Sequence, residues 1–347
     1  MAERVGLGVV GLGMWAEVLA QAVARSAKLR LVSGYTRAAE TRAAFAARYG
    51  CRPAASYEAL LADPEVEGVL VTSPNQDHPA HACAAAGAGK HVFLEKPMAN
   101  TVREAKAILR ACQQAGVVLS IGHEFRRAPA HRAMKAMGEA GELGRLLMAE
   151  GNFSTRAGLA TRPGHWKWRR ENIPGGPMTQ VGIHQFDTLC YLLGRPARVT
   201  ACFSRVATPA EMDDVTQALV EFESGALGYV GAAYSSPITF FTNLYGTEAN
   251  LFFAVDTMGE GHTAHHVGRS GELWAQKAGA ARRERVPLRE GDVLVEELEE
   301  FAECIRLGKR PEVDGEQGLL TAVLVLAAVR SAREHRPVAV QELLEEA

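Results

Sequence analysis

The sequence predicts an α/β domain with a doubly wound parallel sheet of the Rossmann type, followed by an α+β domain with an open, mainly antiparallel sheet and helices. Three observations predict this: strand and helix patterns alternate in the first third, a glycine-rich turn follows the first strand, and the second half is strand-rich. A chain of 347 residues is too long for one ordinary core. We place a first domain at residues 1–122 and a second domain at residues 123–347, whose C-terminal helices can pack back on the first domain.

In the first domain, short apolar runs alternate with segments of helical spacing. The run at 4–10 ends in Gly11, after which Val18, Leu19 and Val23 recur at helical intervals. Strands joined by helices of this length form a parallel sheet with right-handed crossovers. Ser56 and Thr101 are suited to cap the helices that follow them. The expected strands are 4–10, 29–35, 66–72, 91–94 and 117–121, and the expected helices are 15–26, 38–49, 56–61, 79–86 and 101–115.

The second domain shows a different pattern. Its strand-like segments are rich in Val, Phe and Tyr and are separated by glycine turns, which is typical of antiparallel pairing. The expected strands are 146–153, 198–204, 215–223, 226–233 and 239–245, and the expected helices are 129–138, 178–193, 293–307 and 316–333.

The composition argues against several classes of protein. The formal charge of −2 gives no field that would attract nucleic acid, and no run of about 18 apolar residues predicts a membrane span. The N-terminus does not resemble a signal peptide, and the six cysteines form no CxxC pair, so we expect reduced thiols in the cytoplasm. His262, His265 and His266 have no cysteine nearby; we interpret them as a solvated loop and expect no metal site.

The segment Gly11-Leu12-Gly13-Met14-Trp15-Ala16 reads GxGxxA between a strand and a helix. Gly11 permits a sharp turn, and Gly13 allows the backbone to approach a pyrophosphate. The N–H groups at the helix start, around Met14 and Trp15, would then face the phosphates. This motif predicts a dinucleotide site.

The end of the second strand, where an acidic residue usually selects NAD, reads Tyr35-Thr36-Arg37. Thr36 and Arg37 can donate hydrogen bonds to a 2′-phosphate, which favours NADP. NAD stays an alternative, because Arg37 can instead stack on adenine or lie in solvent.

Two further strands are expected to end at the same edge of the sheet, where ligands bind. The first is followed by Ser73-Pro74-Asn75 and then His78, which are placed to contact cofactor ribose. The second is followed by Glu95-Lys96-Pro97; the lysine can reach the nicotinamide, and the proline can hold a cis bond. Lys96 can alternatively be an ordinary surface lysine at a strand end.

The run from Val71 to Pro97, with its Gly-Lys-His-Val and Glu-Lys-Pro strings, resembles the glucose–fructose oxidoreductase/inositol dehydrogenase/MocA family. The resemblance extends over nearly the whole chain. It implies that Lys96 contacts both the cofactor and the reacting hydroxyl, that a cis bond precedes Pro97, and that the second domain makes subunit contacts.

The segment from Gly175 to Asp187 places Gln180, His184 and Asp187 on one face of a helix, at spacings of four and three. In the resembling family this helix commonly reads Asp-x-Gly-x-His-x-x-Asp, and its histidine is the acid/base. His184 therefore takes that role by resemblance. Gln180 replaces the usual aspartate and cannot relay a proton, which puts the usual relay in doubt. A buried core histidine and an Asp187 that braces a helix are the structural alternatives.

Other side chains suit a sugar-like substrate. Guanidinium groups and aromatic faces bind hydroxyl and carboxylate groups, and the aromatic ones here lie in a loop bounded by Gly and Pro. The alternative is that they make subunit or interdomain contacts. The candidates are Arg126, Arg127, Trp166, Trp168, Arg169 and Arg170.

Together these features predict an NAD(P)-dependent dehydrogenase that moves a hydride between nicotinamide and a secondary hydroxyl or carbonyl of a sugar, cyclitol such as inositol, or related polyol. Two alternatives are an NAD-dependent glycoside hydrolase with an internal redox cycle and a non-catalytic NAD(P)-sensing regulator. We expect a homodimer or homotetramer formed through the C-terminal sheet.

Overall fold

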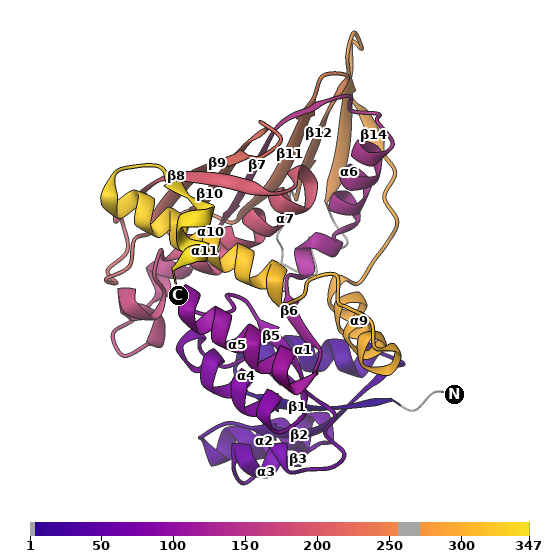
Figure 1. Ribbon diagram of the computed structural model, residues 1–347, viewed down its shortest axis with the longest axis vertical. Coiled ribbons are helices and arrows are strands. Elements are labelled where there is room, and N and C mark those ends of the chain that lie inside the picture. Colours follow the sequence, from indigo (N-terminus) through magenta and orange to yellow (C-terminus); the bar gives the residue numbers. More distant parts are fainter. Residues whose placement is uncertain (1–3, 256–270, 347) are drawn as a thin grey trace. The chain divides into compact units, whose positions relative to one another are not determined.

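A computed structural model describes residues 4–255 and 271–346, and the chain divides into two compact units (Figure 1). The first unit contains residues 1–123 and 294–320, and the second contains residues 124–293 and 321–347. The division after His123 is next to the boundary expected at residue 122. His262, His265 and His266 lie outside the described residues.

A parallel sheet forms the centre of the first unit. Its strands are β1 (Val5–Val10), β2 (Leu29–Tyr35), β3 (Arg52–Pro53), β4 (Gly68–Val71), β5 (His91–Glu95) and β6 (Leu119–Gly122). The spatial order is β3-β2-β1-β4-β5-β6, the order of the doubly wound dinucleotide fold, which confirms the prediction. Strands β1 and β4 are buried along their whole length, because helices cover both faces of the sheet.

The helices of the first unit begin and end close to the expected residues. Both predicted caps are confirmed: Ser56 Oγ accepts from the Ala59 N–H at 3.1 Å, and Thr101 Oγ1 accepts from the Glu104 N–H at 3.2 Å. The cis peptide bond implied before Pro97 is present. The helices are α1 (Met14–Arg25), α2 (Ala39–Tyr49), α3 (Tyr57–Leu61), η1 (Asn75–Asp77), α4 (His78–Gly87), α5 (Val102–Ala115) and α9 (Val293–Leu307).

The second unit is built on a sheet of nine strands in the order β14-β13-β12-β11-β7-β10-β9-β8-β15. The pair β7 and β10 is parallel and the other neighbours are antiparallel, so the sheet is mainly antiparallel as predicted. The strands are β7 (Leu146–Ser154), β8 (Pro196–Ser204), β9 (Val215–Phe222), β10 (Leu227–Ala233), β11 (Thr239–Gly246), β12 (Ala249–Ala254), β13 (Glu272–Lys277), β14 (Glu284–Val286) and β15 (Val338–Ala339).

One face of this sheet is covered by helices. The single helix expected at 178–193 is a π-helical turn, η6, that continues as α7, and both pack on β7 and β10. Helix α11 lies beside β8 at the yellow end of the chain (Figure 1). The helices are η2 (Glu124–Arg127), α6 (Pro129–Glu139), η3 (Ala157–Ala160), η4 (Trp166–Trp168), η5 (Arg170–Asn172), η6 (Met178–Gly182), α7 (Ile183–Leu193), α10 (Gly315–Glu334) and α11 (Val340–Glu345).

The opposite face of the nine-stranded sheet exposes apolar side chains. Leu219 on β9 and Leu227 on β10 are 58% and 53% exposed, and Met148 on β7 is 41% exposed. Half-buried aromatic side chains continue this face along the neighbouring strands. They are Tyr229, Phe241, Tyr245, Phe252 and Trp274.

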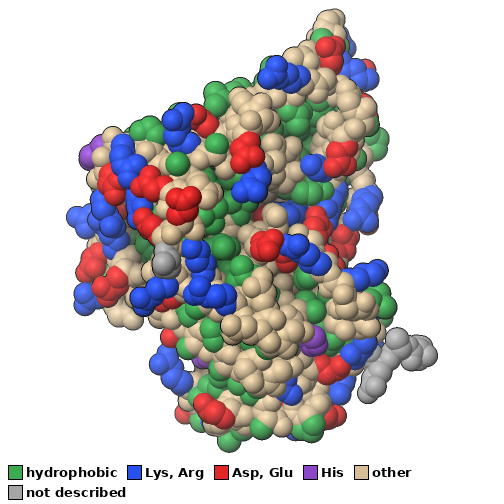
Figure 2. Space-filling model, viewed as in Figure 1, with side chains coloured by type: hydrophobic (Ala, Val, Ile, Leu, Met, Phe, Trp, Pro, Cys, Tyr) green, Lys and Arg blue, Asp and Glu red, His purple; other side chains and the backbone are tan. Residues whose placement is uncertain are grey.

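Charges of both signs are interspersed on the surface shown in Figure 2. Blue and red side chains gather over α10 and α11, where Arg330 and Arg336 pair with Glu342. Within the residues that the structure describes, none of the helices has the length and apolarity needed to span a membrane.

Candidate active site

The glycine turn between β1 and α1 leaves an open cradle. Gly11 has φ +92°, and a Cβ added there would lie 2.5 Å from the Ser73 backbone, so only glycine fits. A Cβ added to Gly13, by contrast, meets none of the described atoms within 4 Å. Gly13 is the N-cap of α1, and Met14, the first residue of the helix, is 73% exposed. A pyrophosphate fits this space beside the N–H groups and the positive end of the helix dipole.

Lys96 follows β5 at the same edge of the sheet. Its Nζ lies 5.9 Å from the centroid of the Trp15 ring, in the first turn of α1. Glu95, which precedes it, is buried beneath Gly122: a Cβ at Gly122 would lie 2.7 Å from Glu95 Oε1. The lysine is therefore next to the helix that would carry the phosphates, as the prediction of a cofactor contact requires.

The buried side chain of His78 holds the turn after β4 in place. The His78 ring is 1% exposed, with Nδ1 2.9 Å from the Pro97 carbonyl and Nε2 2.9 Å from the Ser73 carbonyl. Burial lowers the pKa of His78 to about 4, although both carbonyls act in the opposite direction. The ring that was predicted to contact the cofactor is therefore engaged with two backbone turns, and it holds the turns after β4 and β5 together.

The other residues of this turn are also partly enclosed. Ser73 and Asn75 are 7% and 5% exposed, and Pro74 is half-buried. The Ser73 hydroxyl lies 2.8 Å from His81 Nδ1. The prediction that this turn contacts ribose therefore rests on its backbone and its place at the sheet edge.

A second arginine, Arg42, which the sequence pattern did not single out, lies against the end of β2. Arg42 Nη1 donates to the carbonyls of Thr36 and Arg37 at 2.6 and 3.2 Å, and its guanidinium lies 5.7 Å from the Tyr35 ring centroid. The Arg37 side chain is 88% exposed and its Nη2 lies 3.9 Å from Asp77 Oδ2. The end of β2 is thus cationic, although Asp77 partly offsets the charge.

In the second unit, His184 lies in the first turn of α7 and its side chain is 4% exposed. Phenylalanine rings pack on the imidazole, with centroids 4.4 Å away for Phe125 and 6.0 Å for Phe153. His184 Nδ1 is 3.8 Å from a carboxylate oxygen of Glu124, whose side chain is 1% exposed. Gln180 lies one turn earlier, in η6 and half-buried. π-Helical turns within helices often occur at functional sites.

The side chains of Arg126 and Asp187 are paired with each other. Arg126 Nε donates to Asp187 Oδ2 at 3.1 Å, a second nitrogen donates to Oδ1, and the two side chains are 5% and 1% exposed. The guanidinium also lies 5.4 Å from the Tyr191 ring centroid. This pairing joins η2 to α7, which agrees with the structural alternative that Asp187 braces its helix, while substrate binding by Arg126 stays a prediction. Arg127, also predicted to bind substrate, is 3% exposed.

The loop with the predicted tryptophans packs on its own unit. Trp166 and Trp168 lie against a small apolar cluster around Ile173, Met212 and Tyr234. Arg169 Nη1 lies 4.0 Å from Glu211 Oε1, and Arg170 Nη2 lies 3.5 Å from Asp213 Oδ1. These pairs tie the loop to residues 211–213, and substrate contact by Trp166 and Arg169 stays a prediction.

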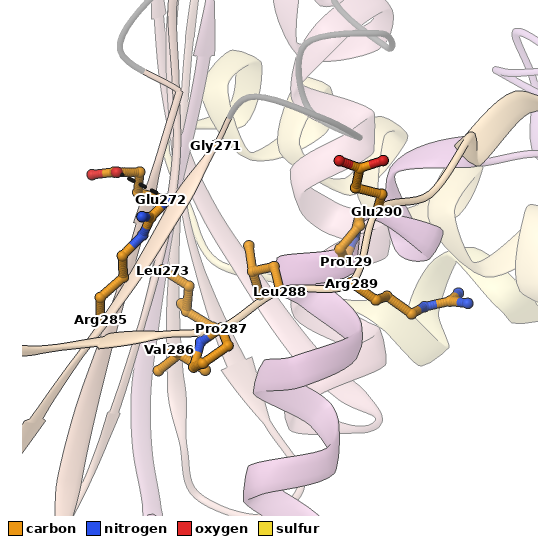
Figure 3. A pocket seen from close by; sticks show the side chains of 10 residues that line it. All are labelled: Pro129, Gly271, Glu272, Leu273, Arg285, Val286, Pro287, Leu288, Arg289 and Glu290. Atoms are coloured by element: carbon orange, nitrogen blue, oxygen red, sulfur yellow. Dashed lines mark ion pairs between the residues drawn. The ribbon is translucent and has the colours of Figure 1, made fainter.

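A separate cavity of about 550 Å³ lies between β13, the connection after β14 and the first residue of α6 (Figure 3). Its polar lining side chains are Glu272, Arg285, Arg289 and Glu290, and Arg285 pairs with Glu272 at 3.2 Å. None of the residues predicted from the sequence lines it, so we do not assign the active site to this cavity. No cluster of three potential metal-ligating side chains occurs within residues 4–255 and 271–346.

Comparison with known proteins gives a consistent assignment for both halves. Residues 5–123 match the model of the oxidoreductase family with an NAD-binding Rossmann fold (GFO/IDH/MocA), and residues 131–252 match the GFO/IDH/MocA C-terminal domain.

Individual relatives cover most of the chain. A 1,5-anhydro-D-fructose reductase of Ensifer adhaerens is 29% identical and aligns with 94% of this chain and 95% of its own. A scyllo-inositol 2-dehydrogenase (NAD(+)) of Bacillus subtilis is 29% identical over 80% of this chain and 79% of its own. A crystal structure from Desulfitobacterium hafniense, provisionally named an NADPH-dependent oxidoreductase, is 38% identical with a TM-score of 0.95, covering 99% of this chain and 100% of that one.

Proposed function

Because this chain belongs to the GFO/IDH/MocA oxidoreductase family, we propose that it transfers a hydride between nicotinamide and a secondary hydroxyl or carbonyl group of a sugar, cyclitol or related polyol. The names of its relatives, a sugar-derivative reductase and an inositol dehydrogenase, support this substrate class. The observation that carries the proposal is the open cradle at Gly13 with Lys96 beside the same helix. A phosphate site next to a fixed cation suits a nicotinamide dinucleotide and a developing alkoxide.

The bound nicotinamide would supply the acceptor or donor of the hydride. In the oxidation direction, His184 takes the hydroxyl proton as the carbonyl forms, and in reduction it returns that proton. Histidine suits both directions because its ordinary pKa is near neutral. Lys96 stabilises the partial negative charge on the reacting oxygen. Gln180 orients a hydroxyl through its amide without changing the charge of the site.

We further propose NADP as the preferred cofactor. The support is the cationic end of β2, where the Arg37 side chain is 88% exposed and Arg42 donates to the Thr36 and Arg37 carbonyls. No carboxylate stands at positions 35–37 to accept a 2′-hydroxyl and repel a phosphate. The relatives include an enzyme named for NAD(+) and one provisionally named for NADPH.

The exposed apolar face of the nine-stranded sheet supports a homo-oligomer, with a second copy of this chain as the occupant. Leucine and aromatic side chains at Leu219, Leu227 and Tyr229 are of the kinds that interfaces bury. All six cysteines lie in the described part of the chain and are free thiols, which supports the cytoplasm as the compartment.

The test is a screen of polyols, inositols and sugars with both oxidised cofactors, followed by the absorbance of reduced nicotinamide. Net cofactor reduction is expected, and Lys96→Ala and His184→Ala should each lower turnover by about 10²–10⁴-fold with unchanged folding. Glycoside cleavage without net reduction would instead show the internal redox cycle of a hydrolase. Cofactor binding with no turnover on the whole panel would favour a sensor, and near-normal activity of both variants would refute the residue assignments.

A further inference from the structure

The structure assigns a positioning role to Glu124: we infer that its carboxylate is the anionic partner of His184 in this protein. The inference deepens the proposed function, because it rests on His184 as the acid/base. Glu124 is separated from His184 by 60 positions in the chain, so no local pattern points to it.

The geometry identifies which atoms are involved. Glu124 begins η2, directly after the last residue of the first unit, and one of its oxygens lies 3.8 Å from His184 Nδ1. This distance is that of an ion pair rather than a hydrogen bond, and such contacts often shorten when substrate binds. Because the carboxylate faces Nδ1, it favours a proton on that nitrogen and leaves Nε2 to exchange a proton with substrate.

Burial makes the pairing strong. The two side chains are 1% and 4% exposed, and the rings of Phe125 and Phe153 pack on the imidazole. In such surroundings a carboxylate stabilises a neighbouring imidazolium far more than it would in water. Two other buried charged side chains on these elements, Arg126 on η2 and Asp187 on α7, pair with each other.

The position one turn before His184 explains why the partner comes from elsewhere. Gln180 is there, in η6, and its amide carries no charge. An aspartate at this position would place a carboxylate on the same helical segment as His184. In this chain the negative charge is supplied from η2 instead, by a residue that the helix pattern alone could not reveal.

The role in the step is electrostatic and leaves Glu124 ionised. In oxidation, a bound nicotinamide would accept the hydride from the substrate carbon. The hydroxyl proton would go to His184 Nε2 as the O–H bond breaks and the C=O bond forms, leaving a carbonyl compound, the reduced nicotinamide and an imidazolium. Glu124 stabilises that imidazolium without taking the proton itself.

The experiment compares Glu124→Gln, Glu124→Asp, Gln180→Asp and the double variant E124Q/Q180D. E124Q should lower kcat by about a hundredfold with little change in KM for substrate or affinity for cofactor. Glu124→Asp should retain much of the activity, and the double variant should recover at least about tenfold over E124Q, because it restores a carboxylate near the ring. The matched control is Glu139→Gln, an exposed carboxylate on α6 paired with Lys135 at 3.5 Å, which should leave kcat unchanged.

A second readout does not need a substrate. The His184 ring resonances, assigned by their loss in His184→Gln, should titrate at lower pH in E124Q than in the unmodified protein, and at higher pH again in E124Q/Q180D. Unchanged titration in E124Q would overturn the inference even if the enzyme is active. If no substrate is oxidised by the unmodified protein, the proposed function fails, while the titration still decides whether Glu124 and His184 are coupled. Unchanged kcat in E124Q, or a double variant no better than E124Q, also counts against the role.

Discussion

Acidification should destabilise the second unit through one buried histidine, His131 on α6. The ring is fully buried, with Nδ1 2.7 Å from the Phe125 carbonyl and Nε2 3.1 Å from the Thr242 hydroxyl. Burial lowers the pKa of His131 to about 4, against a weaker opposing effect of the Phe125 carbonyl. The folded protein therefore keeps this ring neutral at pH values where the unfolded chain already protonates it.

The size of the effect follows from the two pKa values. An unfolded histidine titrates at about 6.5, so between about pH 6.5 and 4 the unfolded state binds a proton that the folded state does not. The stability that depends on neutral His131 is complete above about pH 6.5 and is lost as the pH falls toward 4. A difference of about 2.5 pKa units corresponds to about 3 kcal/mol.

The assay is urea unfolding at neutral pH and at pH 4, followed by tryptophan fluorescence in a Trp15→Phe background. Trp166, Trp168 and Trp274 then report on the second unit alone. His131→Gln should lower the free energy of unfolding by about 1–3 kcal/mol at neutral pH because hydrogen bonds are lost. On acidification, its free energy of unfolding should fall by about 3 kcal/mol less than that of the parent protein. Exposed His335→Asn serves as the control and should keep the parent's pH dependence. If acidification lowers the free energy of unfolding of the parent and of His131→Gln equally, the reasoning is refuted.

Three further outcomes are expected. Gly13→Ala should fold normally, because its Cβ meets none of the described atoms within 4 Å. It should weaken cofactor binding at least about tenfold in a fluorescence titration, and unchanged affinity would argue against the phosphate cradle. Arg37→Ala should weaken NADPH binding by about ten- to a hundredfold and leave NADH nearly unaffected, so equal losses would contradict 2′-phosphate recognition. Leu219→Glu should convert an oligomer to monomers in light scattering, and an unchanged mass would exclude the sheet face as the contact.

Local signals in the sequence were sufficient for most of the fold. Ser56 and Thr101 marked helix starts because a hydroxyl cap acts within three residues, and the alternation of strand and helix implied the parallel sheet. The strands β12 to β15 were not predicted, and for β14 and β15 the reason is their length. They have three and two residues, too few to show a period.

The candidate site was predictable only where chemistry follows a contiguous motif. The glycine turn, Lys96 and His184 were proposed in this way, and their roles stay predictions. The pairing of Arg126 with Asp187 and of Glu124 with His184 joins residues 61 and 60 positions apart, and a single sequence carries no signal for such contacts. His78 shows another limitation: the sequence places it after the strand that ends at the sheet edge, but only coordinates reveal that its ring is engaged with the Ser73 and Pro97 carbonyls.

The rings behind His184 continue into the sheet. Phe125 packs on Phe240 at 5.1 Å between centroids, and Phe240 packs on Phe253 of β12 at 6.1 Å. The position of the His184 side chain therefore depends on each ring in this row, because tightly packed interiors transmit changes in volume. Selection on catalysis can therefore act at Phe253, which is the third ring from the imidazole and lies on β12. A survey confined to substrate contacts would class Phe253 as a core residue only.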